Sequence, residues 1–180
     1  MVTRNFIPFP ILTTDRLTLR QLSTTDKQNI FTLRSSPEIN KYLDRQPSKT
    51  IEDAINFINA INNSIKKNDS LYWAITLTNS KTFVGTICLF DFSEEKNTCE
   101  IGYELLTDFQ GQGIMIEADE KIIDYVFETM KLQKIEAFTH IDSQHSTKLL
   151  ENLGFKKLTD VGTENPDYIS FTLTNSVAVV

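Results

Sequence analysis

Several features that define whole classes of protein are scarce in this sequence. The 180 residues include only 2 cysteines and 6 glycines, which excludes a disulfide framework and a collagen-like chain. No uncharged apolar run approaches the roughly 18 residues that a membrane-spanning helix needs, and the first ten residues lack the apolar segment of a signal peptide. We therefore expect a cytoplasmic protein without a membrane partner.

Basic residues are also scarce. The chain has 18 Lys and Arg against 24 Asp and Glu, a formal net charge of -6. Binding of nucleic acid needs a basic face that neutralises phosphates, so we expect no nucleic-acid partner. The acidity is compatible with a cationic substrate such as an amine. The hydrophobic fraction of 40% is ordinary, and no repeat or linker divides the chain, so we predict a single domain over residues 1–180.

Metal-binding and covalent cysteine chemistry are not indicated. Cys88 and Cys99 have no metal-ligand spacing and no base beside them in the sequence, so we predict two small buried apolar residues without a catalytic role. The only histidines, His140 and His145, have no second ligand or nucleophile close by in the sequence. We therefore predict no metal site.

Hydrophobic periodicity predicts an α/β fold. Residues 16–22 alternate apolar and polar side chains, as in a half-buried strand. Thr50 and Asp53 resemble a capping box that begins a helix, Pro37 is expected to stop the helix before it, and Gly154 is expected to end a later one. In order, we expect strand 16–22, helices 26–34 and 51–67, strands 71–77, 82–92 and 97–106, helix 113–130, strand 134–141, helix 143–152, and strands 155–161 and 168–174.

The segment 100–115 carries the most functional information. A strand ends, a loop with Gly111 and Gly113 follows, and a helix begins at once. This arrangement directs unpaired backbone N–H groups and the positive end of a helix at a ligand, which suits a phosphate. A Rossmann fingerprint needs a third glycine where Ile116 stands, and a P-loop needs a lysine and a hydroxyl after Gly113. We predict a phosphate cradle of another kind, although a plain strand-to-helix turn has the same pattern.

Three segments resemble motifs of the GNAT N-acetyltransferases, in the same order and at the same spacing as in that family. One of them resembles a particular branch, the ribosomal-protein N-terminal (alanine/serine) acetyltransferase-like proteins. The resemblance covers residues 13–175. The segments are Thr14–Arg20, similar to the first strand of that branch; Glu100–Ala118, similar to the acetyl-CoA motif with Gln110-x-x-Gly113 at its centre; and Ser146–Phe155, similar to a short helix that ends in Gly-Phe.

The resemblance implies a GNAT-like α/β fold and a co-substrate. The central, mostly antiparallel sheet would have about seven strands, splayed in a V between the strands 100–106 and 134–141, with about four flanking helices. Acetyl-CoA would donate its acetyl group directly to a primary amine, on a small molecule or a protein N-terminus. Backbone groups of Leu105 and Leu106 would pair with the pantetheine arm, and those of Gln110, Gly111, Gln112, Gly113 and Ile114 would hold the pyrophosphate.

Three positions depart from the pattern of the family. Among the expected cofactor-binding positions, Met115 replaces a glycine or alanine, which could crowd the phosphates, and Ser143 replaces an asparagine. Leu150 stands where many relatives have the tyrosine that protonates the departing thiolate. The remaining candidate for that proton donor is Ser146, although a plain hydroxyl at a helix start fits the same residue.

The amine must also lose a proton before it attacks. Glu100 and Glu104 lie four residues apart on one strand and therefore on one face. Either carboxylate could accept the proton, directly or through water, and either could instead be a surface carboxylate without a catalytic role. The predicted catalytic residues are thus Glu100, Glu104 and Ser146.

Other functions fit the same residues. One is a non-catalytic acetyl-CoA-binding module on the same fold, and another is a different phosphate-binding α/β domain. The acceptor is left open: specificity is expected in residues 26–34, 35–50 and 51–67, and a ribosomal-protein N-terminus, a peptide, a polyamine and an antibiotic amine all fit. A homodimer is compatible with the sequence.

Overall fold

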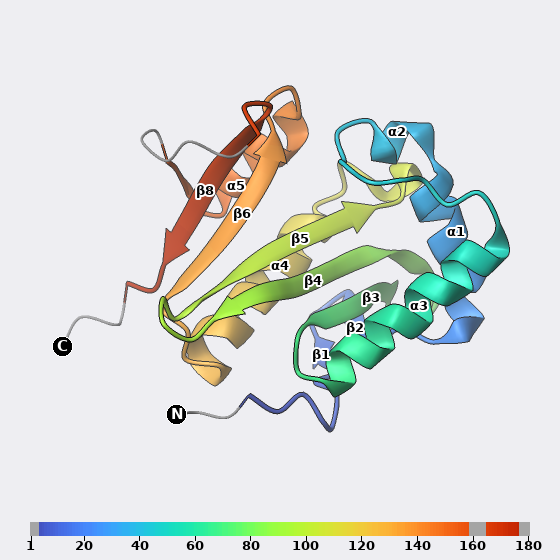
Figure 1. The fold of residues 1–180 in the computed structure, drawn as a ribbon, viewed down its shortest axis with the longest axis horizontal. Coiled ribbons are helices and arrows are strands. Elements are labelled where there is room, and N and C mark those ends of the chain that lie inside the picture. Colours follow the sequence, from blue (N-terminus) through green and yellow to red (C-terminus); the bar gives the residue numbers. More distant parts are fainter. Residues whose placement is uncertain (1–3, 159–164, 177–180) are drawn as a thin grey trace.

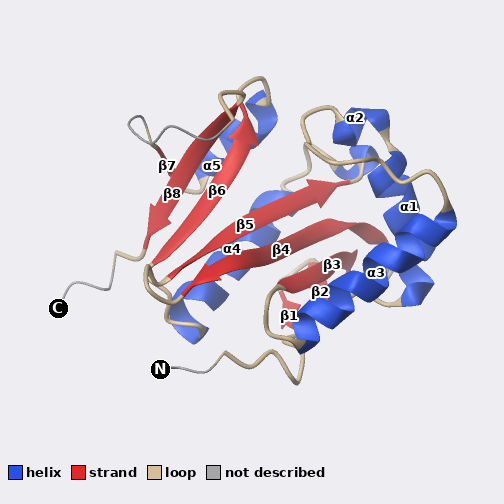
Figure 2. Cartoon of the chain, viewed as in Figure 1, coloured by secondary structure: helices blue, strands red, loops and turns tan. Residues whose placement is uncertain are grey.

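The computed structural model describes residues 4–158 and 165–176. Over these residues, eight strands form one sheet, with helices on both of its faces (Figures 1 and 2). The strands are β1 (Leu12–Thr13), β2 (Leu17–Gln21), β3 (Leu71–Leu77), β4 (Phe83–Ser93), β5 (Thr98–Leu105), β6 (Lys134–His140), β7 (Lys156–Lys157) and β8 (Tyr168–Thr174). The α-helices are α1 (Lys27–Ser35), α2 (Pro37–Asn40), α3 (Ile51–Lys66), α4 (Ile114–Asp124) and α5 (Gln144–Asn152).

The sheet is splayed at its middle. Its strand order is β1-β2-β3-β4-β5-β6-β8-β7, and every neighbouring pair is antiparallel except β5 and β6. Those two parallel strands pair only between Thr98–Glu100 and Lys134–Glu136. Beyond this point they diverge, and Figure 1 shows the resulting V. The predicted mostly antiparallel, V-shaped α/β sheet is confirmed, with one short strand and one short helix more than expected.

Helix α3 forms where its sequence predicts. The Thr50 side chain accepts the N–H of Asp53, and the Asp53 carboxylate accepts the N–H of Thr50, so the capping box is complete. Ala54, Ile58 and Ile65 are fully buried on one side of the helix. This apolar stripe covers one face of the sheet, and α4 covers the opposite face with Ala118 and Ile122 (Figure 1).

Some boundaries differ from the prediction. Pro37 does follow the end of α1, but it also begins α2, because the first helical position needs no backbone N–H. The predicted helix 113–130 is α-helical only to Asp124 and continues as a π-helical turn, Tyr125–Thr129. Of the predicted strand 155–161, only Lys156–Lys157 is a strand, and residues 159–161 lie outside the described part. No helix within the described ranges is both long and apolar enough to cross a membrane.

Asp119 on α4 is an unusual core residue. Its side chain is fully buried, and neither carboxylate oxygen has a hydrogen-bond partner among the described residues. Burial raises the pKa of this carboxyl well above its usual range. The raised pKa means that the folded state is favoured most below the unfolded value near 3.8 and loses stability as the pH rises through the folded value.

We therefore expect Asp119→Asn, which cannot ionise, to be more stable than the parent at pH 8 and similar to it at pH 4. Thermal unfolding followed from pH 4 to pH 9 measures both melting curves. A difference in Tm that stays constant over that range would show that ionisation of Asp119 costs the fold nothing.

Candidate active site

The loop between β5 and α4 has the features of an anion cradle. Gly111 and Gly113 both adopt a left-handed φ of 73°, and Gly113 precedes α4 without any side-chain cap. Within the described residues, the N–H groups of Gly111, Gln112 and Gly113 donate to no backbone carbonyl. No atom of the described residues lies within 4 Å of a Cβ added to Gly111, so this side of the loop is open. The loop therefore presents free donors beside the positive end of an 11-residue helix.

The glutamine side chains of this loop brace it internally. Gln110 Nε2 donates to the Leu105 carbonyl at 3.1 Å, and Gln112 Nε2 donates to the Asp108 carbonyl at 2.8 Å. Both side chains thus hold the loop in shape, and what the loop offers a ligand is its backbone.

Arg16 is a site residue whose role sequence reasoning missed. Its Nη1 donates to the Gln112 carbonyl at 3.0 Å, and its Nε donates to the Glu117 carboxylate at 2.6 Å. Its Nη2 lies 3.5 Å from the position that a Cβ on Gly113 would take. The half-exposed guanidinium, ion-paired with Glu117, therefore lies beside the cradle. The only available signal was the place of Arg16 in the first-strand motif.

Glu117 holds this arrangement together. Its carboxylate also accepts the Thr14 hydroxyl at 2.5 Å and the Arg16 N–H at 3.1 Å. Partial burial raises the pKa of Glu117, but the hydrogen bonds from Thr14 and Arg16 outweigh burial, and the net effect lowers it. Glu117 thus links the turn before β2 to the first turn of α4.

The three residues that depart from the family pattern lie in different places in the fold. The Met115 side chain is 8% exposed and packs in the core, and its predicted contact with the phosphates stays a prediction. Ile114 is buried beside it, and Leu150 on α5 is completely buried. Ser143 is the residue before α5, at the end of the turn that follows β6. It therefore lies on the arm of the V opposite the cradle (Figure 1).

The backbone of β5 faces the V at alternate residues. The Leu106 N–H donates to the Val84 carbonyl on β4 at 2.9 Å. Because hydrogen-bonded pairs alternate along antiparallel strands, the Tyr103 and Leu105 backbone groups point away from β4 and toward the V. Of the two predicted pantetheine contacts, Leu105 is the one with its N–H directed into the V.

The two arms of the V are in contact at their open end. Tyr42, in the segment after α2, stacks near His140 of β6 with ring centroids 5.2 Å apart, and His140 lies 5.7 Å from the Tyr168 ring of β8. The Tyr168 hydroxyl donates to the Tyr42 carbonyl at 3.2 Å. His140 is thus part of an aromatic contact that joins the N-terminal helices to the far arm.

The predicted carboxylates share one face of β5 but differ in environment. Glu104 forms an ion pair with Arg45, from the segment between α2 and α3, and its side chain is 10% exposed. Glu100 is half-buried at the vertex of the V, and no ion pair or hydrogen bond engages its carboxylate among the described residues. Burial, followed by the nearby Asp91 and Glu136 carboxylates, raises the pKa of Glu100 to about 7.

The opposite face of β5 carries a pair of hydroxyls. The Tyr103 Oη and Ser146 Oγ atoms are 2.9 Å apart, which joins β5 to α5. Burial, and then the Asp119 carboxyl, raise the pKa of Tyr103 more than the hydrogen bond to Ser146 lowers it. The phenol therefore keeps its proton at neutral pH. No sequence pattern indicates this contact, because the two residues lie 43 positions apart in the chain.

The cysteines lack the properties of nucleophiles. Cys99 is buried and Cys88 is half-buried, and both are free thiols. Burial is the main cause that raises the pKa of Cys99 to about 12 and that of Cys88 still higher. Neither thiol supplies appreciable thiolate at neutral pH. Among the described residues, no cluster of three or more His, Cys, Asp or Glu side chains could hold a metal ion.

A family profile and individual relatives all match this chain to N-acetyltransferases. The profile of the family described as acetyltransferase (GNAT) domain matches residues 16–156. The uncharacterized N-acetyltransferase YoaA of Bacillus subtilis (strain 168) is 32% identical over 149 residues, which are 83% of this chain and 84% of that protein. The uncharacterized N-acetyltransferase p20 of Bacillus licheniformis is 33% identical over 147 residues, 81% of this chain and 82% of that protein.

Solved structures share the fold. The ribosomal-protein-S5-alanine acetyltransferase of Vibrio fischeri superposes with a TM-score of 0.79 at 21% identity, over 93% of this chain and 98% of that one. The microcin C7 self-immunity acetyltransferase MccE, solved in complex with acetyl-CoA and AMP, superposes with a TM-score of 0.77 at 20% identity, over 90% and 94%. The family profile covers most of the chain, and the two Bacillus proteins exceed 30% identity over more than four fifths of it. The protein therefore belongs to the GNAT acetyltransferase family and is an acyltransferase.

Proposed function

We propose that the protein transfers the acetyl group of acetyl-CoA directly to a primary amine. The observation that carries this proposal is the open cradle at Gly111–Gly113, flanked by the Arg16 guanidinium, at the end of the strand that borders the V. Free N–H donors, a helix N-terminus and one arginine suit a pyrophosphate. The complex of the related fold MccE with acetyl-CoA supports the same choice.

We assign the proton transfers to residues on the two faces of β5. Glu100 accepts the proton of the amine, because a carboxyl with a pKa of about 7 is half ionised near neutral pH and basic enough to act. Glu104 is the weaker candidate because Arg45 engages it. As the amine nitrogen bonds to the carbonyl carbon and the C–S bond breaks, Ser146 donates its proton to the sulfur and regains one from water, while the Tyr103 hydroxyl 2.9 Å away keeps its own proton and orients the Ser146 oxygen.

The Tyr103–Ser146 hydroxyl pair favours an enzyme over the alternative function, a non-catalytic acetyl-CoA-binding module. A binding module that had lost its chemistry would have no need of a proton donor, whereas Tyr103 and Ser146 provide one where Leu150 cannot. Release of CoA in the presence of an acceptor distinguishes the two functions. The single domain, the cytoplasmic location, the homodimer and the lack of a nucleic-acid partner stay predictions of the sequence.

The cradle is tested with Gly111→Asp and Gly111→Asn. Both side chains tolerate a left-handed φ and have the same shape, so they differ only in charge. We expect Gly111→Asn to bind acetyl-CoA within about threefold of the parent, and Gly111→Asp to bind about 10- to 100-fold more weakly, because its carboxylate would face phosphates. Calorimetric titration measures both. Equal affinity of the two variants would place the pyrophosphate elsewhere.

A further inference from the structure

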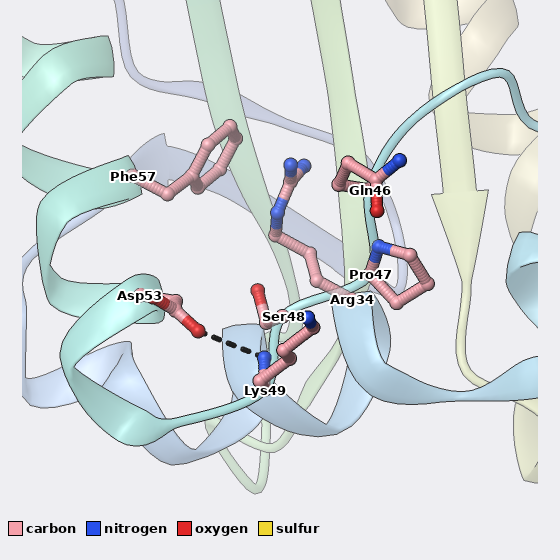
Figure 3. A pocket seen from close by; sticks show the side chains of 7 residues that line it. All are labelled: Arg34, Gln46, Pro47, Ser48, Lys49, Asp53 and Phe57. Atoms are coloured by element: carbon pink, nitrogen blue, oxygen red, sulfur yellow. Dashed lines mark hydrogen bonds between the residues drawn. The ribbon is translucent and has the colours of Figure 1, made fainter.

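A second concave site lies on the other side of β5 from the Tyr103–Ser146 pair. It is a pocket of about 350 Å³ between α1, α3 and the segment 46–49 that leads into α3 (Figure 3). Arg34 of α1 projects into it between Phe57 and Gln46, and Lys49 and Asp53 line its rim. The transfer chemistry assigned above uses none of these side chains.

Arg34 is the central feature of this pocket. Its guanidinium lies over the Phe57 ring, 3.8 Å from the centroid. Its Nε is buried and has no hydrogen-bond partner among the described residues. An arginine held against an aromatic ring keeps its planar donors in a defined direction, so less entropy is lost when a ligand binds.

Among the residues that the structure describes, Arg34 forms no ion pair, because the carboxylates near it are engaged elsewhere. Glu104, the nearest carboxylate on β5, is ion-paired with Arg45. The Asp53 carboxylate accepts the N–H groups of Lys49 at 2.8 Å and Thr50 at 2.9 Å as the cap of α3. No ion pair engages Lys49 in the described part of the chain. The pocket therefore has an excess of positive charge in a protein whose net charge is -6.

The pocket adjoins the transfer site through Glu104 and Arg45. Glu104 lies one residue before Leu105, whose backbone faces the V. Burial is the main cause that lowers the pKa of Arg34, and both Arg45, which lowers it further, and Glu104, which raises it, are close enough to contribute. Arg45 belongs to the segment that runs from Tyr42, at the open end of the V, to the pocket rim. This segment therefore connects the open end of the V to the rim of the pocket.

We propose that this pocket binds a negatively charged group of the acceptor, a carboxylate or a phosphate, with Arg34 as its counter-ion. The inference rests on the proposed acetyl transfer and specifies its substrate class. Amines that carry an anion are then acceptors, and polyamines, which carry only positive charges, are poor ones. Arg34 acts here as a specificity residue and takes no part in proton transfer.

The test uses acceptors that are matched except for charge. β-Alanine is compared with β-alaninamide, and phosphoethanolamine with ethanolamine, while spermidine represents the polyamines. Release of CoA is measured with the parent, with Arg34→Gln, and with Lys27→Gln, which removes one positive charge from an exposed position of the same helix. We expect the parent to favour at least one anionic acceptor over its neutral partner by about tenfold or more in kcat/KM. The pair that shows the preference distinguishes a carboxylate from a phosphate.

Arg34→Gln is expected to abolish that preference through KM and to leave kcat for neutral amines and the affinity for acetyl-CoA unchanged. Lys27→Gln is expected to keep the preference. Arg34→Lys keeps the positive charge but lacks the planar set of guanidinium donors, so its preference for the anionic acceptor is expected to lie between those of Arg34→Gln and Lys27→Gln. This variant replaces Arg34→Gln in the test if the glutamine variant does not fold. Equal efficiency with charged and neutral acceptors, a preference for spermidine, or an equal effect of Arg34→Gln and Lys27→Gln would overturn the proposal.

A binding measurement separates this inference from the proposed function. Inorganic phosphate and acetate are titrated into the parent and Arg34→Gln without acetyl-CoA, and the signals of the pocket residues are followed by NMR. Binding that depends on Arg34 supports the pocket even if no amine is acetylated. Absence of Arg34-dependent binding in both titrations contradicts the pocket even if acetyl transfer is confirmed.

Discussion

Replacing Glu100 by glutamine is expected to lower kcat by about 10²–10⁴-fold, the usual contribution of a general base. In the parent, the rate should rise with pH through the pKa of about 7, because only the ionised carboxyl accepts a proton. The variant should lose this rise while its affinity for acetyl-CoA stays the same. Steady-state kinetics from pH 5.5 to pH 9, with the best acceptor found, measures both effects.

Two further variants identify the role of Glu100. Glu104→Gln should leave the midpoint of the pH profile in place, and Ser146→Ala should lower kcat without moving it. Glu100→Gln should also melt above the parent at pH 8, because the raised pKa of Glu100 means that stability is lost as the pH rises from the unfolded value of 4.5 through about 7. If all three variants stay within threefold of the parent in kcat, these residues are structural and the cleft itself selects the neutral amine.

Replacing Gly85 by alanine is expected to destabilise the fold by about 3 kcal/mol. Gly85 lies on β4 opposite Leu105. A Cβ there would clash with the Glu104 carbonyl oxygen and lie 3.0 Å from the Leu105 Cα atom. Both are backbone atoms of β5, which cannot move aside without breaking the β4–β5 pairing next to the V. Denaturant unfolding of the two proteins measures the loss.

Gly102→Ala is the matched control for this prediction. Gly102 is also a strand glycine of the same sheet, but its added Cβ would meet side chains, Cys88 Sγ at 3.2 Å and Phe90 Cε1 at 3.3 Å. Side chains can shift by a few tenths of an ångström, so we expect a loss of about 1 kcal/mol or less. Equal losses in the two variants would show that the close approach of β4 and β5 at Gly85 is not special.

Much of the fold was predictable because its signals are local. The capping box of Thr50 and Asp53 joins residues three positions apart, and both of its hydrogen bonds are present. The left-handed residues of the cradle are the glycines from which it was predicted. The π-helical turn at Tyr125–Thr129 was not predictable in this way, because an apolar side chain every fourth residue is compatible with either kind of turn.

The sequence by itself determined the order of the elements, the place of the cradle and the family resemblance, since each depends on residues close together in the chain. Only the tertiary structure decided which distant residues meet. Arg16 reaches Glu117 across 101 positions, and Tyr103 reaches Ser146 across 43. Glu100 and Glu104 have the same residue type on the same face, yet one is uncompensated at the vertex of the V and the other is paired with Arg45. Burial and charge pairing arise from the packing of separate elements, so the spacing of residues along one strand cannot reveal them.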